Sequence, residues 1–330
     1  MIRVAINGFG RIGRTVLKKL ITYNEVEIVA INDLTSPETL AHLFKYDSIH
    51  RKFSGTVSST LKSLVINGKD IPVFAEKDPS LLPWQKLNVD VVIESTGHFT
   101  KAELAEAHVK AGARKVIISA PGKGDLKTVV LGVNEHILDG SEKVISNASC
   151  TTNNAAPMLK ILDDNWGIES AYITTVHAYT GDQNIHDAPH KDLRRARAAA
   201  NSIIPTTTGA AKALTEIFPN LKGNIGGAGI RVPVIDGSLT DITCILKKPA
   251  DVDSINKAFK NASETTMKGI IEYTSDPIVS FDIIGNPYSC IFDSLLTSVL
   301  GTMAKIVGWY DNEMGYSTRL AELTVMVGKK

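Results

Sequence analysis

The chain has 330 residues, of which 43% are hydrophobic and 22% charged, and its formal net charge is +1 at neutral pH. This length is about twice that of a typical domain, so we expect two domains, each with its own hydrophobic core. The small net charge excludes an overall field for nucleic acid or membranes, and no apolar run approaches the ~20 residues that span a bilayer.

The cysteines predict the redox compartment. Cys150, Cys244 and Cys290 are odd in number and widely spaced, without CxxC pairs or histidine clusters. This usage argues against a disulfide framework and against structural zinc, and it predicts a reducing, cytoplasmic location with no metal. The apolar run at residues 2–7 is too short for a signal peptide.

A glycine-rich turn follows the first predicted strand. The strand covers residues 2–7, and the GxGxxG sequence at residues 8–13 leads from it into a helix. Its glycines allow a tight turn, close approach to a pyrophosphate, and close packing of helix on strand. A second strand, 26–31, precedes Asp33, whose carboxylate can bind ribose hydroxyls and repel a 2′-phosphate. The pattern predicts dinucleotide binding; the alternative is a glycine turn followed by a helix-capping Asp33.

The rest of the first half predicts an open, doubly wound parallel sheet of the Rossmann type. Asn67-Gly68 indicates an antiparallel hairpin across residues 64–73. Parallel strands are expected at 89–94 and 115–119, with a helix at 101–111 between them. Further strands are expected near Val129 and Val144. Ligands bind at the carboxyl ends of such strands. Thr96, Gly97 and Ser119 are therefore expected beside the cofactor, although residues of these types more often form turns.

The pattern changes after residue 150. Long alternating strands are expected at 168–178, 238–247 and 298–310, and helices at 209–218 and 251–263. This pattern predicts an α+β domain with a mainly antiparallel sheet and helices on one face. We expect a dinucleotide-binding domain at 1–149, to which a helix at 317–330 returns, and a catalytic domain at 150–316.

Cys150 is the candidate nucleophile. It follows a strand-like run at 143–146 and precedes an apolar-periodic run at 155–162, so we expect it in the first turn of a helix. Free backbone N–H groups and the positive end of the helix dipole there favour a thiolate. His177 ends the strand that begins at residue 168 and is a candidate base. The alternatives are a small buried cysteine and a structural histidine.

Cationic and hydroxyl groups suited to phosphate cluster in the second half. They are Arg195, Arg231, Thr180, Thr206, Thr207 and Thr208, the last of which is followed by Gly209. Thr208-Gly209 also resembles a helix start, which is an anion site; the alternative is structural capping. Region 178–205 has little periodicity and is expected to be either a functional loop or a solvated surface loop. Together with the dinucleotide turn and the thiolate, these groups suggest oxidation of a phosphorylated aldehyde through a thioester.

Five segments in family order carry a resemblance that covers essentially the whole chain. They are Ile6–Arg14, Ala148–Asn153, Thr174–His177, Pro205–Lys212 and Trp309–Glu313. On these motifs the sequence resembles the phosphorylating glyceraldehyde-3-phosphate dehydrogenases of glycolysis and gluconeogenesis. The resemblance implies that Cys150 attacks the aldehyde to give a hemithioacetal, and that His177 polarises the thiol and acts as general base. Hydride passes to NAD, and inorganic phosphate opens the thioester to give 1,3-bisphosphoglycerate.

The same resemblance implies the binding residues. Those that surround the substrate's C3 phosphate are Thr180, Asp182, Arg195 and Arg231. Those that hold the attacking phosphate are Ser149, Thr151, Thr208 and Gly209. Those implied to bind NAD are Asn7, Gly8, Gly10, Arg11, Ile12, Asp33, Lys77, Thr96, Gly97, Ser119, Asn312 and Tyr316. The loop at 178–205 corresponds to the S-shaped loop of the family, so the implied assembly is a homotetramer, with no dedicated nucleic-acid or membrane partner.

Two departures from the family pattern are informative. Asn154 stands where many relatives have a second cysteine, which removes a possible disulfide partner under oxidation. Ala188 stands where strictly NAD-dependent relatives usually have leucine, while Asp33-Leu34 keeps the NAD-type pattern. We therefore expect NAD preference with weakened discrimination against NADP.

Two other functions fit parts of the sequence. An erythrose-4-phosphate dehydrogenase shares the cysteine, the histidine and the cofactor fold, but it releases its product by hydrolysis. The segment 208–212 and Arg195 favour the phosphorylating triose enzyme. The second alternative is a non-catalytic NAD-binding or surface-binding protein, against which the presence of both Cys150 and His177 argues.

Overall fold

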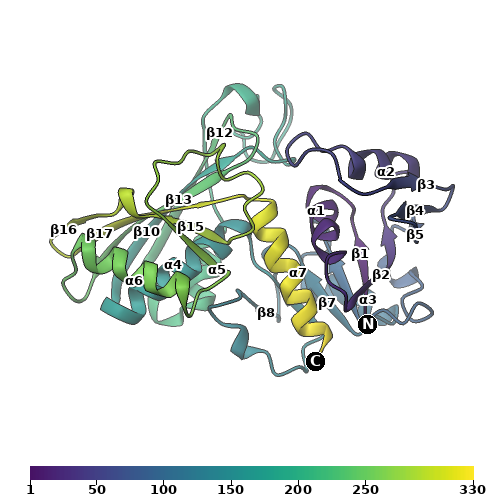
Figure 1. The fold of residues 1–330 in the computed structure, drawn as a ribbon, viewed down its shortest axis with the longest axis horizontal. Helices are drawn as coiled ribbons and strands as arrows, with labels where there is room; N and C mark the ends of the chain where they lie inside the picture. Colours follow the sequence, from purple (N-terminus) through teal and green to yellow (C-terminus); the bar gives the residue numbers. More distant parts are fainter. The chain divides into compact units, whose positions relative to one another are not determined.

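The computed structural model describes all 330 residues and divides them into two compact units (Figure 1). The first unit comprises residues 1–129, 136–148 and 317–330, and the second comprises 130–135 and 149–316. No helix combines the length and the apolar character that a membrane span requires.

The first unit is built on a nine-stranded sheet in the order β3-β4-β5-β2-β1-β6-β7-β9-β8. Its strands are β1 (Ile2–Asn7), β2 (Val26–Asn32), β3 (Val57–Ser59), β4 (Ser63–Ile66), β5 (Lys69–Phe74), β6 (Val91–Glu94), β7 (Lys115–Ile118), β8 (Lys127–Thr128) and β9 (Val144–Ser146). All neighbours from β5 to β8 pair in parallel, and β3, β4 and β5 pair antiparallel. The expected parallel sheet and the expected hairpin around Asn67-Gly68 are both confirmed.

The helices of the first unit are α1 (Arg11–Leu20), α2 (Pro37–Lys45), α3 (Ala102–Lys110) and most of α7 (Met314–Gly328), with short 3₁₀ turns at Pro79–Leu81 and Glu135–Ile137. Helices α1, α2 and α3 each bury one face, whereas α7 is buried on nearly all sides. In α1 the residues Val16, Leu17 and Leu20 are fully buried, which is the spacing of one helix face. One core cluster gathers around Trp84 and includes Val92 and Val116 from the sheet.

The second unit is built on an eight-stranded sheet whose main order is β11-β12-β10-β13-β17-β15-β14, with β16 paired to β17. Its strands are β10 (Ile168–Ala178), β11 (Ile204–Thr206), β12 (Ile225–Val232), β13 (Ser238–Leu246), β14 (Ile271–Thr274), β15 (Cys290–Asp293), β16 (Ser298–Leu300) and β17 (Met303–Tyr310). Most pairs are antiparallel; β10 with β12 and β14 with β15 are parallel. The mainly antiparallel sheet is therefore confirmed.

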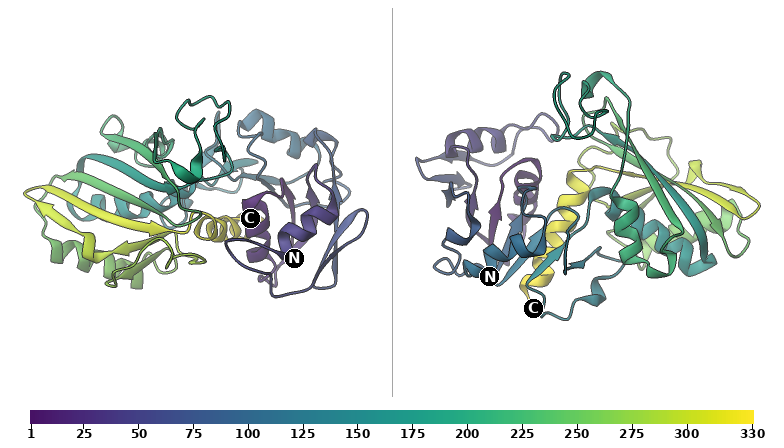
Figure 2. Two further views of the ribbon diagram at one scale, coloured as in Figure 1. Left: turned by 90° about the horizontal axis from the view of Figure 1, so that it is seen from above. Right: turned by 180° about the vertical axis from the view of Figure 1, so that it is seen from behind.

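Three helices cover one face of this sheet (Figures 1 and 2). They are α4 (Cys150–Trp166), α5 (Ala210–Ile217) and α6 (Val252–Glu264), and 3₁₀ turns lie at Ala199–Asn201, Pro219–Leu221 and Ser294–Leu296. Along β13 buried and partly exposed residues alternate, because only one face of the sheet packs against helices.

The expected single strand at 298–310 is wrong. The structure folds this segment into the antiparallel hairpin β16–β17. Gly301 takes a positive φ of 62° at the turn, a conformation that glycine adopts without steric cost. Because apolar residues alternate on both sides of Gly301, the sequence pattern does not indicate this turn.

Gly13 sets the contact between α1 and the end of β1. A Cβ atom at Gly13 would lie 2.2 Å from the backbone oxygen of Gly8, whereas a Cβ at Gly10 would meet no atom within 4 Å. We therefore expect Gly13→Ala to lower the free energy of unfolding by about 2 kcal/mol, because the helix must shift to relieve the overlap. Chemical denaturation monitored by circular dichroism measures this change. Gly10→Ala is the matched control, and an equal loss of stability in both variants would contradict the prediction.

Candidate functional site

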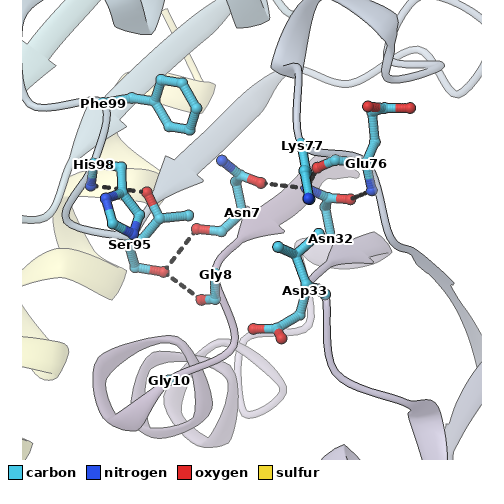
Figure 3. Close-up of a pocket in the computed structure, with 12 residues that line it drawn as sticks. Asn7, Gly8, Gly10, Asn32, Asp33, Glu76, Lys77, Ser95, His98 and Phe99 are labelled. Carbon is cyan, nitrogen blue, oxygen red and sulfur yellow. Dashed lines mark hydrogen bonds between the residues drawn. The ribbon is translucent and has the colours of Figure 1, made fainter.

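A cavity of about 510 Å³ opens in the first unit beside the carboxyl ends of β1, β2 and β6. Its walls are formed by Asn7, Gly8, Gly10, Asn32, Asp33, Leu34, Glu76, Lys77, Ser95, Thr96, His98 and Phe99. Figure 3 shows Ser95, His98 and Phe99 on one side and Asp33, Glu76 and Lys77 on the other, with Asn7 and Gly8 between them. This is the sheet edge at which ligands bind in open α/β folds.

The glycine turn shapes one wall of this cavity. Gly8 has a φ of 90°, and a Cβ there would lie 2.7 Å from the backbone nitrogen of Thr96. Gly8 therefore brings the turn against the loop after β6. The open space around Gly10 leaves the backbone accessible to a ligand. These are the roles that the sequence predicts for the first two glycines of a dinucleotide turn.

Asp33 is fixed at the carboxyl end of β2. Its Oδ2 accepts a hydrogen bond from the backbone N–H of Phe9 at 2.8 Å, and its Oδ1 accepts one from Thr35 at 2.9 Å. The carboxylate is thereby oriented beside the glycine turn, where a ribose hydroxyl can donate to its remaining lone pairs. The cradle at Gly10, the cavity and this acceptor fit the adenosine half of a dinucleotide.

Most of the cofactor residues expected in the first unit lie at or beside this cavity. Asn7, Gly8, Gly10, Asp33, Lys77 and Thr96 line it. Arg11 and Ile12 begin α1, and Arg11 also pairs with Asp47 at 3.0 Å. Gly97 continues the loop after β6. Ser119 follows β7, and its backbone N–H donates to the backbone carbonyl oxygen of Glu94 at 2.9 Å.

Sequence analysis missed several wall residues. Asn32 immediately precedes Asp33, and Glu76 immediately precedes Lys77, at the ends of two neighbouring strands. Ser95, His98 and Phe99 belong to the same loop as Thr96. The signal that could have found them is their position directly after a buried strand.

Cys150 begins α4, as the sequence predicts. Ser149 is the N-cap residue, and its hydroxyl accepts the backbone N–H of Thr152 at 3.1 Å. This cap satisfies one N–H of the first turn and fixes where the helix starts. The cysteine sulfur therefore lies at the positive end of a 17-residue helix.

The structure brings Cys150 and His177 together. The Sγ atom lies 3.4 Å from Nε2 of His177, which stands at the end of β10. Nδ1 lies 2.7 Å from the carbonyl oxygen of Ala178. A general base requires the tautomer with its proton on Nδ1, which leaves the Nε2 lone pair facing the sulfur; the Ala178 carbonyl can accept that proton and also accepts a hydrogen bond from Arg231 Nη1 at 3.0 Å.

Burial acts on both members of this pair. It raises the pKa of the Cys150 thiol, while the charge of Arg231 opposes this rise. Burial, together with the same arginine, lowers the pKa of His177 to about 3. Both shifts favour the uncharged form of the group concerned, whereas the positive end of α4 favours the thiolate.

Tyr310 links the elements that carry the cysteine and the histidine. Its hydroxyl lies 2.9 Å from the hydroxyls of both Thr151 in α4 and Thr175 in β10. Its ring meets the His177 ring edge-on, with 5.9 Å between the centroids. Tyr310 lies in the Trp309–Glu313 segment, but the sequence does not predict this linking role, because a buried tyrosine near a strand end carries no distinctive signal.

A group of charged side chains surrounds the far side of His177. Arg231 Nη1 lies 2.9 Å from His177 Nδ1 and donates to the Thr180 hydroxyl at 3.0 Å. Asp182 accepts hydrogen bonds from Thr180 and Arg195. Burial would raise the pKa of Asp182, but the Thr180 hydrogen bond and the two arginines outweigh it and lower that pKa.

The four residues expected around the substrate phosphate are therefore connected to one another by hydrogen bonds. Thr206, which the sequence also singled out, lies beside them: it accepts from Arg195 Nε at 3.0 Å and donates to Asp192 at 2.6 Å. Arg195 is paired with both Asp182 and Asp192, at 3.8 Å from the latter, whereas Arg231 donates to the neutral Thr180 hydroxyl and has no carboxylate bonded to it among these residues. Such a pocket can receive a phosphate dianion.

The residues expected around the attacking phosphate occupy two helix starts. Ser149 and Thr151 flank Cys150, and the Thr151 hydroxyl is already bonded to Tyr310. Thr208 and Gly209 precede α5, where the Thr208 hydroxyl accepts the N–H of Ala210 at 3.2 Å.

Asn312 and Tyr316 follow β17 in the second unit. The Asn312 side-chain oxygen accepts a hydrogen bond from the Ser238 hydroxyl at 2.8 Å, which fixes the orientation of the amide. Both Asn312 and Tyr316 are buried.

The three thiols are expected to differ sharply in reactivity. Cys150 is partly exposed beside a base, whereas Cys244 and Cys290 are buried, and burial raises the pKa of Cys244 to about 12. Reaction of the native protein with a disulfide reagent should therefore modify one thiol quickly, and all three only after unfolding. The absorbance of the thiolate that the reagent releases measures the number of cysteines modified. Cys150→Ser is the control, and a fast-reacting thiol that persists in this variant would contradict the assignment.

Comparison with known proteins shows similarity along the whole chain. A family model described as "Glyceraldehyde 3-phosphate dehydrogenase, NAD binding domain" matches residues 2–102, and one described as "Glyceraldehyde 3-phosphate dehydrogenase, C-terminal domain" matches residues 149–312. The chain is 55% identical over 332 residues to glyceraldehyde-3-phosphate dehydrogenase 2 of Streptomyces avermitilis, with 100% of this chain and 99% of the relative covered. It is 54% identical over 335 residues to the Mycobacterium avium glyceraldehyde-3-phosphate dehydrogenase, with 99% of each covered. It is 51% identical over 335 residues to that of Clostridium acetobutylicum, with 100% of this chain and 99% of the relative covered.

Proposed function

Because this chain belongs to the glyceraldehyde-3-phosphate dehydrogenase family, we propose that it converts glyceraldehyde 3-phosphate and inorganic phosphate to 1,3-bisphosphoglycerate with NAD. The chain is an NAD-dependent oxidoreductase that acts on an aldehyde. The observation that carries the proposal is the 3.4 Å contact between Cys150 Sγ and His177 Nε2 beside the arginine pocket.

The first step is formation of a covalent adduct. His177 Nε2 takes the proton of the Cys150 thiol, and the sulfur attacks the aldehyde carbon to form the C–S bond of a hemithioacetal. The aldehyde oxygen becomes an alkoxide in this step and takes the proton back from His177 Nε2, which returns the imidazole to its neutral form. The helix start at Cys150 provides backbone N–H groups that stabilise the negative charge.

The second step is oxidation of the adduct. Bound NAD supplies the hydride acceptor. His177 removes the proton of the hemithioacetal hydroxyl as the C–H electron pair departs, so the carbon becomes the carbonyl carbon of a thioester. The oxidation energy is retained in the C–S bond. A phosphate oxygen then attacks this carbonyl, the acyl phosphate leaves, and the sulfur is released as thiolate.

The second unit supplies the residues for both phosphate groups. We assign the substrate's C3 phosphate to Thr180, Asp182, Arg195 and Arg231, since two guanidinium groups and a hydroxyl converge there. We assign the attacking phosphate to Ser149, Thr151, Thr208 and Gly209, at the starts of α4 and α5.

The first unit binds the cofactor in this proposal. Asn7, Gly8, Gly10, Arg11, Ile12, Asp33, Lys77, Thr96, Gly97 and Ser119 would hold NAD there, and Asn312 and Tyr316 of the second unit would orient the nicotinamide. The oriented Asp33 carboxylate supports this assignment, because it can accept hydrogen bonds from ribose hydroxyls.

We further propose a homotetramer in a reducing cytoplasm. The loop at 178–205 exposes large apolar side chains, with Ile185 78% exposed, Leu193 81% and Ile203 70%. Such residues are typical of a surface that another subunit covers. The three free cysteines favour a reducing compartment.

Phosphate dependence tests the proposed reaction. Steady-state NADH formation from glyceraldehyde 3-phosphate should require inorganic phosphate, because only phosphate opens the thioester efficiently. Cys150→Ser should lower kcat by at least about a thousandfold, since an alcohol at this position lacks the nucleophilicity of a thiolate. Absorbance at 340 nm measures both effects.

Two outcomes would overturn the proposal. Rapid phosphate-independent turnover of erythrose 4-phosphate, with little activity on the triose, would indicate the hydrolytic alternative. Binding of NAD without turnover of either aldehyde would indicate a non-catalytic protein.

Cofactor choice provides a second test. The Asp33 carboxylate should repel the 2′-phosphate of NADP, whereas Ala188 is expected to weaken this discrimination. We predict a higher kcat/KM for NAD than for NADP, and Asp33→Asn should reduce the ratio by about tenfold, or 1.4 kcal/mol. Equal kcat/KM values for the two cofactors in the unaltered enzyme would contradict the prediction.

A further inference from the structure

We propose that Glu94 and His108 are positioning residues that hold the adenosine half of the cofactor pocket in its binding geometry. Neither side chain lines the pocket in this proposal; both act through residues that do. The inference rests on the cofactor role of the pocket in the first unit.

Glu94 ends β6 and is only 2% exposed. One carboxylate oxygen, Oε1, accepts the backbone N–H of Thr96 at 2.8 Å and also the Thr96 hydroxyl. The other, Oε2, accepts the side-chain N–H of Asn7 at 2.5 Å and lies 3.1 Å from His108 Nε2. A group that receives four donors must be ionised. Through Thr96 and Asn7 it determines the position of two pocket walls.

His108 is fully buried in α3, and its tautomer follows from its partners. Trp84 Nε1 lies 2.9 Å from His108 Nδ1. An indole N–H can only donate, so Nδ1 is the acceptor and the ring proton is on Nε2. His108 therefore donates to Glu94 Oε2 as a neutral imidazole. The ring stacks on Trp84, with 6.2 Å between the centroids, and this contact restricts its orientation.

The chain of hydrogen bonds continues across the sheet to the opposite wall. The Asn7 side-chain oxygen accepts from Asn32 Nδ2 at 2.7 Å. The Asn32 amide then pairs with the backbone of Glu76, donating to its oxygen at 2.9 Å and accepting from its nitrogen at 2.9 Å. Figure 3 shows this link from Asn7 through Asn32 to the segment that carries Glu76 and Lys77.

The consequence is a pocket whose two sides are joined through one buried carboxylate. If His108 stops donating, Glu94 Oε2 keeps Asn7 as its remaining partner in this network. A buried carboxylate with an unmet hydrogen bond rotates or recruits water, because an unsatisfied buried acceptor is costly. Either response displaces Thr96 and Asn7, and the geometry that receives the adenosine is lost.

Two substitutions each remove one of the two hydrogen bonds of His108, the one from Trp84 or the one to Glu94, and keep the other. In His108→Gln the side-chain NH₂ takes the place of Nε2 and can still donate to Glu94, but the acceptor for Trp84 is lost. In His108→Asn the side-chain oxygen takes the place of Nδ1 and can still accept from Trp84, but the donor to Glu94 is lost. The two amides differ by one methylene and serve as matched controls.

The test measures binding of ADP-ribose by calorimetry and NADH formation by the full-length enzyme. We expect His108→Asn to weaken ADP-ribose binding and to raise the KM for NAD, each by about tenfold. Its kcat at saturating NAD and its KM for glyceraldehyde 3-phosphate should stay within about twofold of the unaltered values, since the chemistry lies on other residues. His108→Gln should keep both affinities within about twofold and should shift the emission of Trp84, whose indole loses its acceptor.

Several results would overturn the proposal. One is ADP-ribose affinity in His108→Asn within twofold of the unaltered enzyme. Another is an equal loss of affinity in both variants that parallels a fall in Tm, which indicates a purely structural role. If both variants fail to fold, ¹⁵N spectra of histidine in the unaltered protein decide: His108 should be neutral with its proton on Nε2, and ADP-ribose should shift this signal. An unchanged signal contradicts the proposal. Failure of the unaltered enzyme to bind ADP-ribose would instead reject the cofactor pocket itself.

Discussion

The proposed chemistry depends on one contact, the 3.4 Å approach of Cys150 Sγ to His177 Nε2. The two residues come from different elements, the start of α4 and the end of β10, so the packing of the second unit fixes their separation. Tyr310 reinforces it by bonding to Thr151 and Thr175. Burial raises the pKa of the Cys150 thiol and lowers that of His177, and the Nε2 atom of His177 lies within reach of the thiol proton.

The second constraint is that the oxidised carbon must stay bound to sulfur until phosphate arrives. A free acid would lose the energy of the oxidation, whereas a thioester keeps it for the acyl phosphate. This requirement explains why anion-binding groups surround the cysteine and the histidine. Arg231 contacts both Thr180 and His177, so the group assigned to the substrate phosphate also borders the base. The pocket in the first unit is assigned to the cofactor. There, backbone contacts hold both Asp33 and the glycine turn in place.

Sequence patterns predicted the elements that carry these groups better than the contacts between them. The Rossmann turn could be predicted because Gly8 and Gly13 are each required by close backbone contacts. The helix start at Cys150 could be predicted because a strand-like run precedes it and an apolar-periodic run follows it. β12 was missed, since its Gly-rich sequence is unusual for a strand; the Tyr172 side chain fills the space above Gly226. The turn at Gly301 could not be predicted either, because apolar residues continue on both of its sides. The contacts of Glu94, His108 and Tyr310 could not be predicted, because they involve partners distant in sequence.

The most direct test of the account is to trap the covalent intermediate. The enzyme is mixed with glyceraldehyde 3-phosphate and NAD in the absence of phosphate, quenched in acid, and examined by mass spectrometry. The account predicts a burst of about one NADH per subunit and a 3-phosphoglyceroyl adduct on the peptide that contains Cys150. Addition of phosphate before the quench should remove the adduct. Steady NADH formation without an adduct, or an adduct on a residue other than Cys150, would contradict the account.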